Sequence, residues 1–160
     1  MKKSELTHFD KQGNPSMVDI NQKDSTDRVA IATGKIIMKA NTLKKILNLK
    51  IKKGDVLNIA KLAGIMAAKK TDQLIPLCHS IPLSYVKVDL EPNIEESSVN
   101  ITAEASLVGK TGVEMEALIA VSVAGLTIYD MCKAIDREMI LTNIKLIHKS
   151  GGKSGEFNAI

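Results

Sequence analysis

The sequence predicts an α+β fold in which an antiparallel sheet carries its helices on one face. Sequence patterns give the order strand–helix–helix–strand–strand–helix–strand. Removing the second helix as an extra element leaves β-α-β-β-α-β, the split-βαβ, ferredoxin-like plan. The length of 160 residues suits a single domain over 1–160. Apolar residues make up 44% of the chain but aromatic residues only 2%, so the core has to be aliphatic.

The first half of the chain supplies one strand and two helices. Residues 1–28 are polar and predict an N-terminal arm. The β-branched run VAIATGKIIMK over 29–39 predicts a strand. Helical spacing of apolar residues predicts a helix over 40–49. A basic turn at 50–54 leads into a second predicted helix over 55–70, which has one apolar face.

The second half begins with an irregular segment, because 71–82 (TDQLIPLCHSIP) carries two prolines and is not expected to form a regular element. Residues 83–90 and 98–108 alternate polar and apolar side chains, as half-buried strands do. The acidic turn at 91–96 joins these two strands into a hairpin.

The longest helix is predicted over 111–137. It opens on Thr111, and Glu114 three residues later completes a capping-box pattern. Residues 117–125 are small or apolar nearly all round, which indicates burial on several sides and is typical of a helix that also meets another subunit. The last strand is predicted over 138–148.

Composition narrows the class of protein. A net charge of +4 fits an anionic small ligand as well as nucleic acid. No apolar run of about 18 residues occurs, and the N-terminus lacks an apolar core, so neither a membrane span nor a secretion signal is expected. Cys78 and Cys132 lie far apart, which favours a reducing, cytoplasmic location. Two Phe and two Tyr are few for the stacking platform of an RNA-binding sheet.

The tail over 149–160 carries Lys149 and Lys153 among closely spaced glycines. Glycine lets backbone approach a ligand, and the lysines offer charges to phosphate; a flexible tail is the alternative. The tripeptides at 109–111 (GKT) and 152–154 (GKS) both lack the upstream glycine of a P-loop. The first precedes a predicted helix, whose free amides could still bind an anion.

Two side-chain pairs could carry chemistry. Cys78 and His79 stand on a proline-stiffened loop, without the second pair of ligands that a zinc site needs. Asp130 and Lys133 share one helix face. They form either an exposed ion pair or, among apolar neighbours, a partly buried pair able to transfer protons.

Two charged groups have both a structural and a functional interpretation. Glu114 and Glu116 either complement the helix dipole or accept N–H donors from a ligand. The basic turn at 50–54, which contains Lys53, is either solvated or holds a triphosphate.

Five segments, in this order, resemble the molybdenum cofactor biosynthesis protein C family, and together they cover nearly the whole chain. They are LTHFDKQGNPSMVDI (6–20), KKGDVLNIAKLAGIMAAKKT (52–71), LIPLCHSIPL (74–83), GKTGVEMEALIAVSVAGLTIYDMCKA (109–134) and KSGGKSG (149–155).

The resemblance implies a lyase activity, a fold and an assembly. The family converts 3′,8-cyclo-7,8-dihydroguanosine 5′-triphosphate, which a radical-SAM partner makes from GTP, to cyclic pyranopterin monophosphate and releases diphosphate. Its fold is ferredoxin-like, and its members are homohexamers, trimers of dimers, with active sites at subunit interfaces. No cofactor, metal, nucleic acid or membrane is expected. The sequence does not decide whether Mg²⁺ accompanies the triphosphate, and it shows no dedicated carboxylate cage that would argue for the ion.

The resemblance also assigns site residues. The catalytic residues that it implies are Asp130, Lys133, Lys53 and His79. The substrate-binding residues that it implies are Leu77, Cys78, His79, Glu114, Met115, Glu116, Lys149, Lys153 and Arg28. Ser80 departs from the family pattern, in which proline commonly follows the histidine, so the loop geometry is less closely defined here.

Our hypothesis is that Lys133 is the general acid/base and that Asp130 sets its charge and position, although the sequence also allows the two roles to be exchanged. The other lysines would hold the triphosphate, and the glutamates would bind the guanine-derived ring. The alternative is a non-catalytic purine-nucleotide-binding regulatory domain, which would have no need of the Asp130–Lys133 pair.

Overall fold

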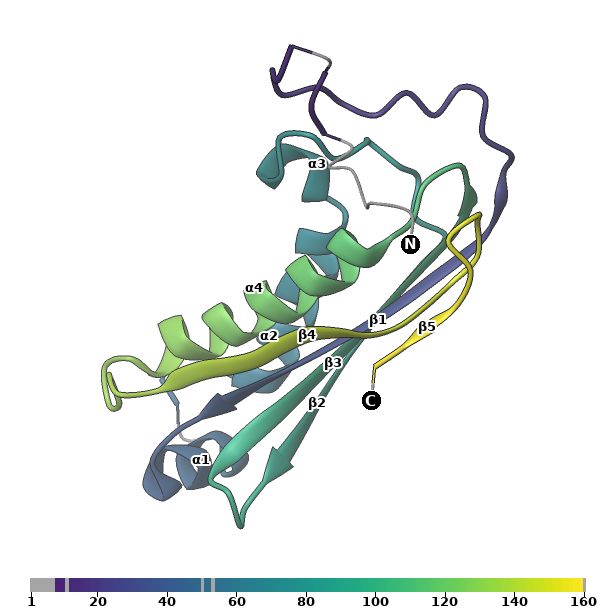
Figure 1. The fold of residues 1–160 in the computed structure, drawn as a ribbon. Coiled ribbons are helices and arrows are strands. Elements are labelled where there is room, and N and C mark those ends of the chain that lie inside the picture. The colour runs from purple at the N-terminus through teal and green to yellow at the C-terminus, as the bar shows by residue number, and fades with distance from the viewer. Residues whose placement is uncertain (1–7, 11, 50, 53, 160) are drawn as a thin grey trace.

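The structure, a computed structural model, describes residues 8–10, 12–49, 51, 52 and 54–159. In chain order the elements are β1 (Thr26–Ile37), α1 (Ala40–Leu47), α2 (Val56–Ala68), α3 (Thr71–Leu74), β2 (Tyr85–Asn93), β3 (Ser98–Gly109), α4 (Glu114–Cys132), β4 (Ile140–Ser150) and β5 (Phe157–Asn158). Figure 1 shows α2 and α4 side by side on one face of the sheet.

The sheet has the strand order β2-β3-β1-β4-β5, and every neighbouring pair is antiparallel. The predicted α+β, ferredoxin-like arrangement is therefore confirmed. Alternation along β1 buries Ala30 and Ala32 completely, and these residues pair in register with Ala105 and Ala103 of β3. The small side chains leave room for the helices to approach the sheet.

Helix α4 is the centre of the core. It packs against α2 and β1, and a Cβ atom added at Gly64 of α2 would lie 2.8 Å from the carbonyl oxygen of Ala120. This close approach explains the run of small residues in α4. Among the described residues, α4 is also the one helix long and apolar enough to cross a membrane by length and composition, but half of that apolar window is buried inside the fold.

Two predictions about the ends of α4 are wrong. The helix ends at Cys132 rather than at 137, because the backbone beyond it turns so that the Asp136 carboxylate can bond the backbone N–H of Lys39 at 2.9 Å. At the start, Val113 is the N-cap residue and no side chain caps the helix. Glu114 does not complete a capping box, since its carboxylate is bonded to Lys149.

The remaining differences concern peripheral elements. One helical turn, α3, precedes the prolines of the segment 71–82. Strand β2 continues through Pro92, where the sequence predicted the start of a turn. An edge strand tolerates proline because a residue there can do without a backbone N–H for a sheet hydrogen bond. The tail contributes a short strand, β5, on the other edge. The extra helix is α1, because the second helix, α2, packs against α4 and the sheet.

Candidate functional site

Two adjoining cavities are lined by residues near the starts of β1 and α4 and near the end of β4. Figure 1 shows that the start of β1 and the tail after β4 lie side by side. The cationic cavity, of about 550 Å³, lies between the start of β1, the turn before α4 and the tail. The carboxylate cavity, of about 430 Å³, lies between the arm, the loop after α3 and the first turn of α4. The residues that line both are Lys23, Thr111, Gly112, Glu114 and Lys149.

An ion pair forms part of the wall between the cavities. The Lys149 Nζ lies 3.1 Å from Glu114 Oε1 and donates to Ser154 Oγ at 2.9 Å. Both members of the pair are partly buried, at 25% and 30% side-chain exposure. Lys149 comes from the end of β4 and Glu114 from the start of α4, so the pair also joins the sheet to the central helix.

The cationic cavity gathers positive charge from distant parts of the sequence. Its charged lining consists of Lys23, Arg28, Lys110, Lys149 and Lys153, with Asp24 and Glu114 as the acidic members. The Arg28 Nε donates to the carbonyl oxygen of Gly109 at 3.2 Å, and Lys110 Nζ donates to the carbonyl oxygen of Asn21 at 2.8 Å. The second bond fixes the arm to the turn before α4. Such a concentration of cations suits an anion with several negative charges.

The glycines of the tail are required by space as well as by backbone conformation. Gly151 and Gly152 have φ values of +93° and +73°, in the left-handed region that favours glycine. A Cβ at Gly151 would lie 1.9 Å from the carbonyl oxygen of Asp27, and one at Gly152 would lie 1.7 Å from Arg28 Nη1. The tail therefore lies directly against the start of β1.

The carboxylate cavity is lined by the loop Leu77–Cys78–His79 and by Met115 and Glu116 of α4. His79 Nε2 lies 2.8 Å from the carbonyl oxygen of Val18. A carbonyl can only accept, so Nε2 carries the proton, and in the neutral ring Nδ1 is left as an acceptor. This bond ties the loop to the arm.

Glu116 has the most perturbed environment in this cavity. The residue is only 4% exposed, and burial, reinforced by the nearby negative charges of Glu114 and Asp72, raises its pKa to about 7. Burial likewise raises the pKa of the Cys78 thiol, with Glu116 as the next contributor. At neutral pH the cavity therefore holds a carboxyl group that can donate as well as accept hydrogen bonds, beside a protonated thiol.

The Asp130–Lys133 pair lies at the other end of α4. Sixteen residues separate Asp130 from Glu114, which corresponds to about 24 Å along the helix. Lys133 Nζ lies 2.7 Å from Asp130 Oδ1, and the two side chains are 53% and 59% exposed. The apolar neighbours of this pair suggested that it could be partly buried. Within the described residues both side chains are instead more than half exposed. Asp130 raises the pKa of Lys133 through this hydrogen bond and its charge.

The structure thus divides the residues singled out in the sequence. Those brought together around the two cavities are Arg28, Leu77, Cys78, His79, Glu114, Met115, Glu116, Lys149 and Lys153. Asp130 and Lys133 lie apart from them, and Lys53 lies outside the described residues.

Sequence reasoning missed Lys23 and Lys110 as individual cavity residues. Lys110 belongs to the GKT tripeptide, which already pointed to an anion at this turn. Lys23 lies in a polar arm, where no local pattern distinguishes it from other surface lysines.

Within the described residues, no group of three or more His, Cys, Asp and Glu side chains is arranged to hold a metal ion.

The fold and the cavities define a class: a ferredoxin-like α+β protein whose cationic cavity adjoins one that holds carboxyl, imidazole and thiol groups. The model of the MoaC family matches residues 17–152. The chain is 58% identical over 152 residues to a cyclic pyranopterin monophosphate synthase of Magnetococcus marinus, covering 95% of this chain and 93% of the relative. It is 57% identical over 154 residues to the synthase of Rhodospirillum rubrum (96% and 93%), and 53% identical over 155 residues to that of Clostridium acetobutylicum (97% and 96%). The chain belongs to the MoaC family.

Proposed function

We propose that this chain is a cyclic pyranopterin monophosphate synthase, a lyase that converts 3′,8-cyclo-7,8-dihydroguanosine 5′-triphosphate to cyclic pyranopterin monophosphate and diphosphate in molybdenum cofactor biosynthesis. The observation that carries the proposal is the pair of adjoining cavities. One is suited to a triphosphate and the other to a guanine-derived ring, and they meet at the Lys149–Glu114 wall.

The cationic cavity binds the triphosphate. Arg28, Lys149 and Lys153 line it, and an Arg guanidinium can contact phosphate with two N–H groups while each Lys acts as a point charge. When the cyclic phosphate forms, the bond from its phosphorus to the diphosphate leaving group breaks, and these cations stabilise the charge that leaves.

The carboxylate cavity binds the ring. Glu114 accepts from ring N–H groups, and Glu116, with its raised pKa, pairs with an acceptor or a donor according to its protonation state. His79 presents an acceptor nitrogen once Nε2 donates to Val18, so it is suited to take part in proton transfer.

Lys133 is the general acid/base of the rearrangement, and Asp130 holds it charged and in position. A single chain keeps this pair about 24 Å from the cavities along α4, which is too far for one substrate to touch both. We therefore propose that a second subunit brings its Asp130–Lys133 pair to the cavities of the first, within a homohexamer built as a trimer of dimers.

The surface of α2 supports packing between subunits. Ile59, Leu62 and Met66 follow one another at helical spacing and are 41%, 61% and 46% exposed. Such an apolar stripe is typical of a surface that another protein covers.

We further propose that the enzyme works in the cytoplasm without a resident cofactor. Among the described residues, Cys78 and Cys132 form no disulfide, which suits a reducing compartment.

The test is to incubate the protein with 3′,8-cyclo-7,8-dihydroguanosine 5′-triphosphate and to measure the formation of diphosphate and cyclic pyranopterin monophosphate. We expect the wild type to form both, and Asp130→Asn to form neither while it still binds the substrate. The non-catalytic nucleotide-binding alternative predicts tight binding by both proteins and product from neither, and that result would refute the proposed function.

A further inference from the structure

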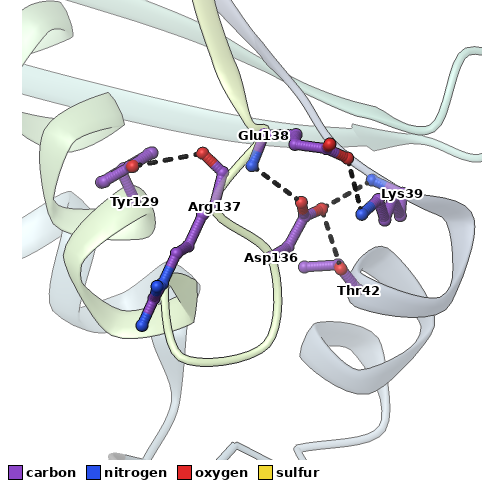
Figure 2. Close-up of polar contacts among 6 residues, drawn as sticks. All are labelled: Lys39, Thr42, Tyr129, Asp136, Arg137 and Glu138. Atoms are coloured by element: carbon purple, nitrogen blue, oxygen red, sulfur yellow. Dashed lines mark hydrogen bonds and ion pairs between the residues drawn. The ribbon is translucent and has the colours of Figure 1, made fainter.

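Asp136 is a charged residue of the interior, with 2% of its surface exposed. Its carboxylate accepts three hydrogen bonds: from the backbone N–H of Lys39 at 2.9 Å, from the Thr42 hydroxyl at 3.0 Å and from the backbone N–H of Glu138 at 3.2 Å. Figure 2 shows these bonds converging on the one side chain. Burial opposes its ionisation, but the hydrogen bonds prevail and lower the pKa of Asp136, so the group is an anion at neutral pH.

This carboxylate joins two elements that are far apart in the sequence. Lys39 is the N-cap residue of α1, and its own side chain makes no capping bond. Asp136 supplies the anion that the amino end of α1 favours. On its other side, the backbone N–H of Asp136 donates to the carbonyl oxygen of Cys132 at 3.1 Å, at the last residue of α4.

A second bond fixes the same turn to α4. The Tyr129 hydroxyl donates to the carbonyl oxygen of Arg137 at 3.2 Å, as Figure 2 shows. Tyr129 is the residue before Asp130. The turn from 133 to 138 is therefore bound to α4 through the Tyr129 side chain and to α1 through Asp136. A weaker link to α1 is the ion pair between Glu138 and Lys39 Nζ at 2.6 Å, because these side chains are 79% and 59% exposed.

We propose that Asp136 is a positioning residue for the reaction, which fixes the carboxyl-terminal turn of α4, and with it Lys133, against the start of α1. The inference rests on the proposed function. Lys133 is the C-cap residue of α4, and its backbone N–H donates to the carbonyl oxygen of Tyr129 at 2.8 Å. The Lys133 and Asp130 side chains are more than half exposed, and Lys133 Nζ donates to Asp130 Oδ1 at 2.7 Å. The backbone of this turn therefore sets the direction in which the bonded pair points.

Asparagine cannot replace the carboxylate. The amide has one oxygen, and its NH₂ group can only donate. In either orientation that NH₂ group faces at least one of the donors from Lys39, Thr42 and Glu138, so the bond to α1 or the bond within the turn is lost. The Asp136→Asn chain can still fold, since the sheet and the α2–α4 core are untouched, but the turn loses at least one of its buried bonds, and the exposed Glu138–Lys39 ion pair is too weak to replace it.

The experiment compares Asp136→Asn with the wild type and with Val88→Ala, a control that removes buried apolar volume from β2, where Val88 is 1% exposed. Diphosphate release is measured at a temperature where all three proteins are fully folded by circular dichroism. We expect kcat of Asp136→Asn to fall by at least about 10-fold, since misplaced catalytic groups are costly. Its KM should stay within about twofold, because the cavities lie at the far end of α4.

The control distinguishes positioning from general destabilisation. Val88→Ala should keep kcat within about twofold of the wild type, even if its melting temperature falls as far as that of Asp136→Asn. An Asp136→Asn kcat equal to that of the wild type, or a fall matched by Val88→Ala, would overturn the positioning role alone. A wild type that releases no diphosphate would overturn the proposed function and this inference with it, so the two failures are distinguishable.

Discussion

The contact between the tail and Arg28 gives a sharp test of the cationic cavity. In Gly152→Ala, the new Cβ would lie 1.7 Å from Arg28 Nη1 and 2.5 Å from Arg28 Cζ. The guanidinium ends a flexible side chain, so it will move away rather than disrupt the fold. The positive φ of +73° adds backbone strain of roughly 1–2 kcal/mol.

The displaced guanidinium should weaken triphosphate binding. A hydrogen bond to a charged group contributes roughly 1.5–3 kcal/mol, which corresponds to a loss of affinity of roughly 10- to 100-fold. Gly155→Ala is the matched control, because Gly155 has a φ of +69° and a Cβ there would meet nothing within 4 Å. Both variants carry similar backbone strain, but only Gly152→Ala displaces Arg28.

The binding of tripolyphosphate is measured by calorimetry. The KM for 3′,8-cyclo-7,8-dihydroguanosine 5′-triphosphate is then measured for the same proteins. Gly152→Ala should bind the anion roughly 10- to 100-fold more weakly than the wild type, and Gly155→Ala should be close to the wild type. Equal binding by the two variants would refute the assignment of Arg28 and the tail to phosphate binding.

Two further predictions concern Glu116 and Lys133. Because the pKa of Glu116 is raised to about 7 from 4.5, its contribution to stability is complete below pH 4.5 and is lost as pH rises toward 7, a change of about 3 kcal/mol. Urea unfolding at pH 5 and pH 8 should show this loss in the wild type but not in Glu116→Gln, and parallel behaviour of the two proteins would contradict it. Lys133→Ala should lower kcat by roughly 10²- to 10⁴-fold, whereas Lys87→Ala, which removes another exposed lysine paired with an aspartate, should leave kcat unchanged. Equal kcat in these two variants would exclude Lys133 as the acid/base.

The fold was predictable from local patterns because β1 coincides with a β-branched run, and β2 and β3 coincide with segments that alternate polar and apolar side chains. The errors arise where distant residues decide the local structure. The pattern of α4 continues past Cys132, and only the bonds from Lys39 and Thr42 to Asp136, almost a hundred residues apart in sequence, explain why the helix ends there. Strand β5 is too short to carry a pattern of its own.

The candidate site was predictable mainly where motif residues lie close together in the sequence. The loop with Cys78 and His79 and the start of α4 are each contiguous, and both line the carboxylate cavity. Lys23 lines the cavities because of the path that the arm takes. Lys110 and His79 fix that path by bonds to backbone carbonyl oxygens of the arm. A sequence pattern cannot show that course. Nor could it show that Glu116 is buried rather than solvated at the helix start.

Mixing two inactive variants tests whether opposite ends of α4 serve one reaction in neighbouring subunits. Lys149→Ala and Lys133→Ala chains, each with its own affinity tag, are co-expressed and purified through both tags, and diphosphate release is measured. Each variant alone should be inactive. In a mixed dimer, one of the two sites combines an intact Lys149 with an intact Lys133. Random pairing makes about half of the dimers mixed, so about a quarter of the wild-type rate should return before purification through both tags. The rate should be higher after that purification, which selects the mixed dimers. Mixed assemblies that remain as inactive as either variant alone would contradict the claim that the two ends meet across a subunit interface.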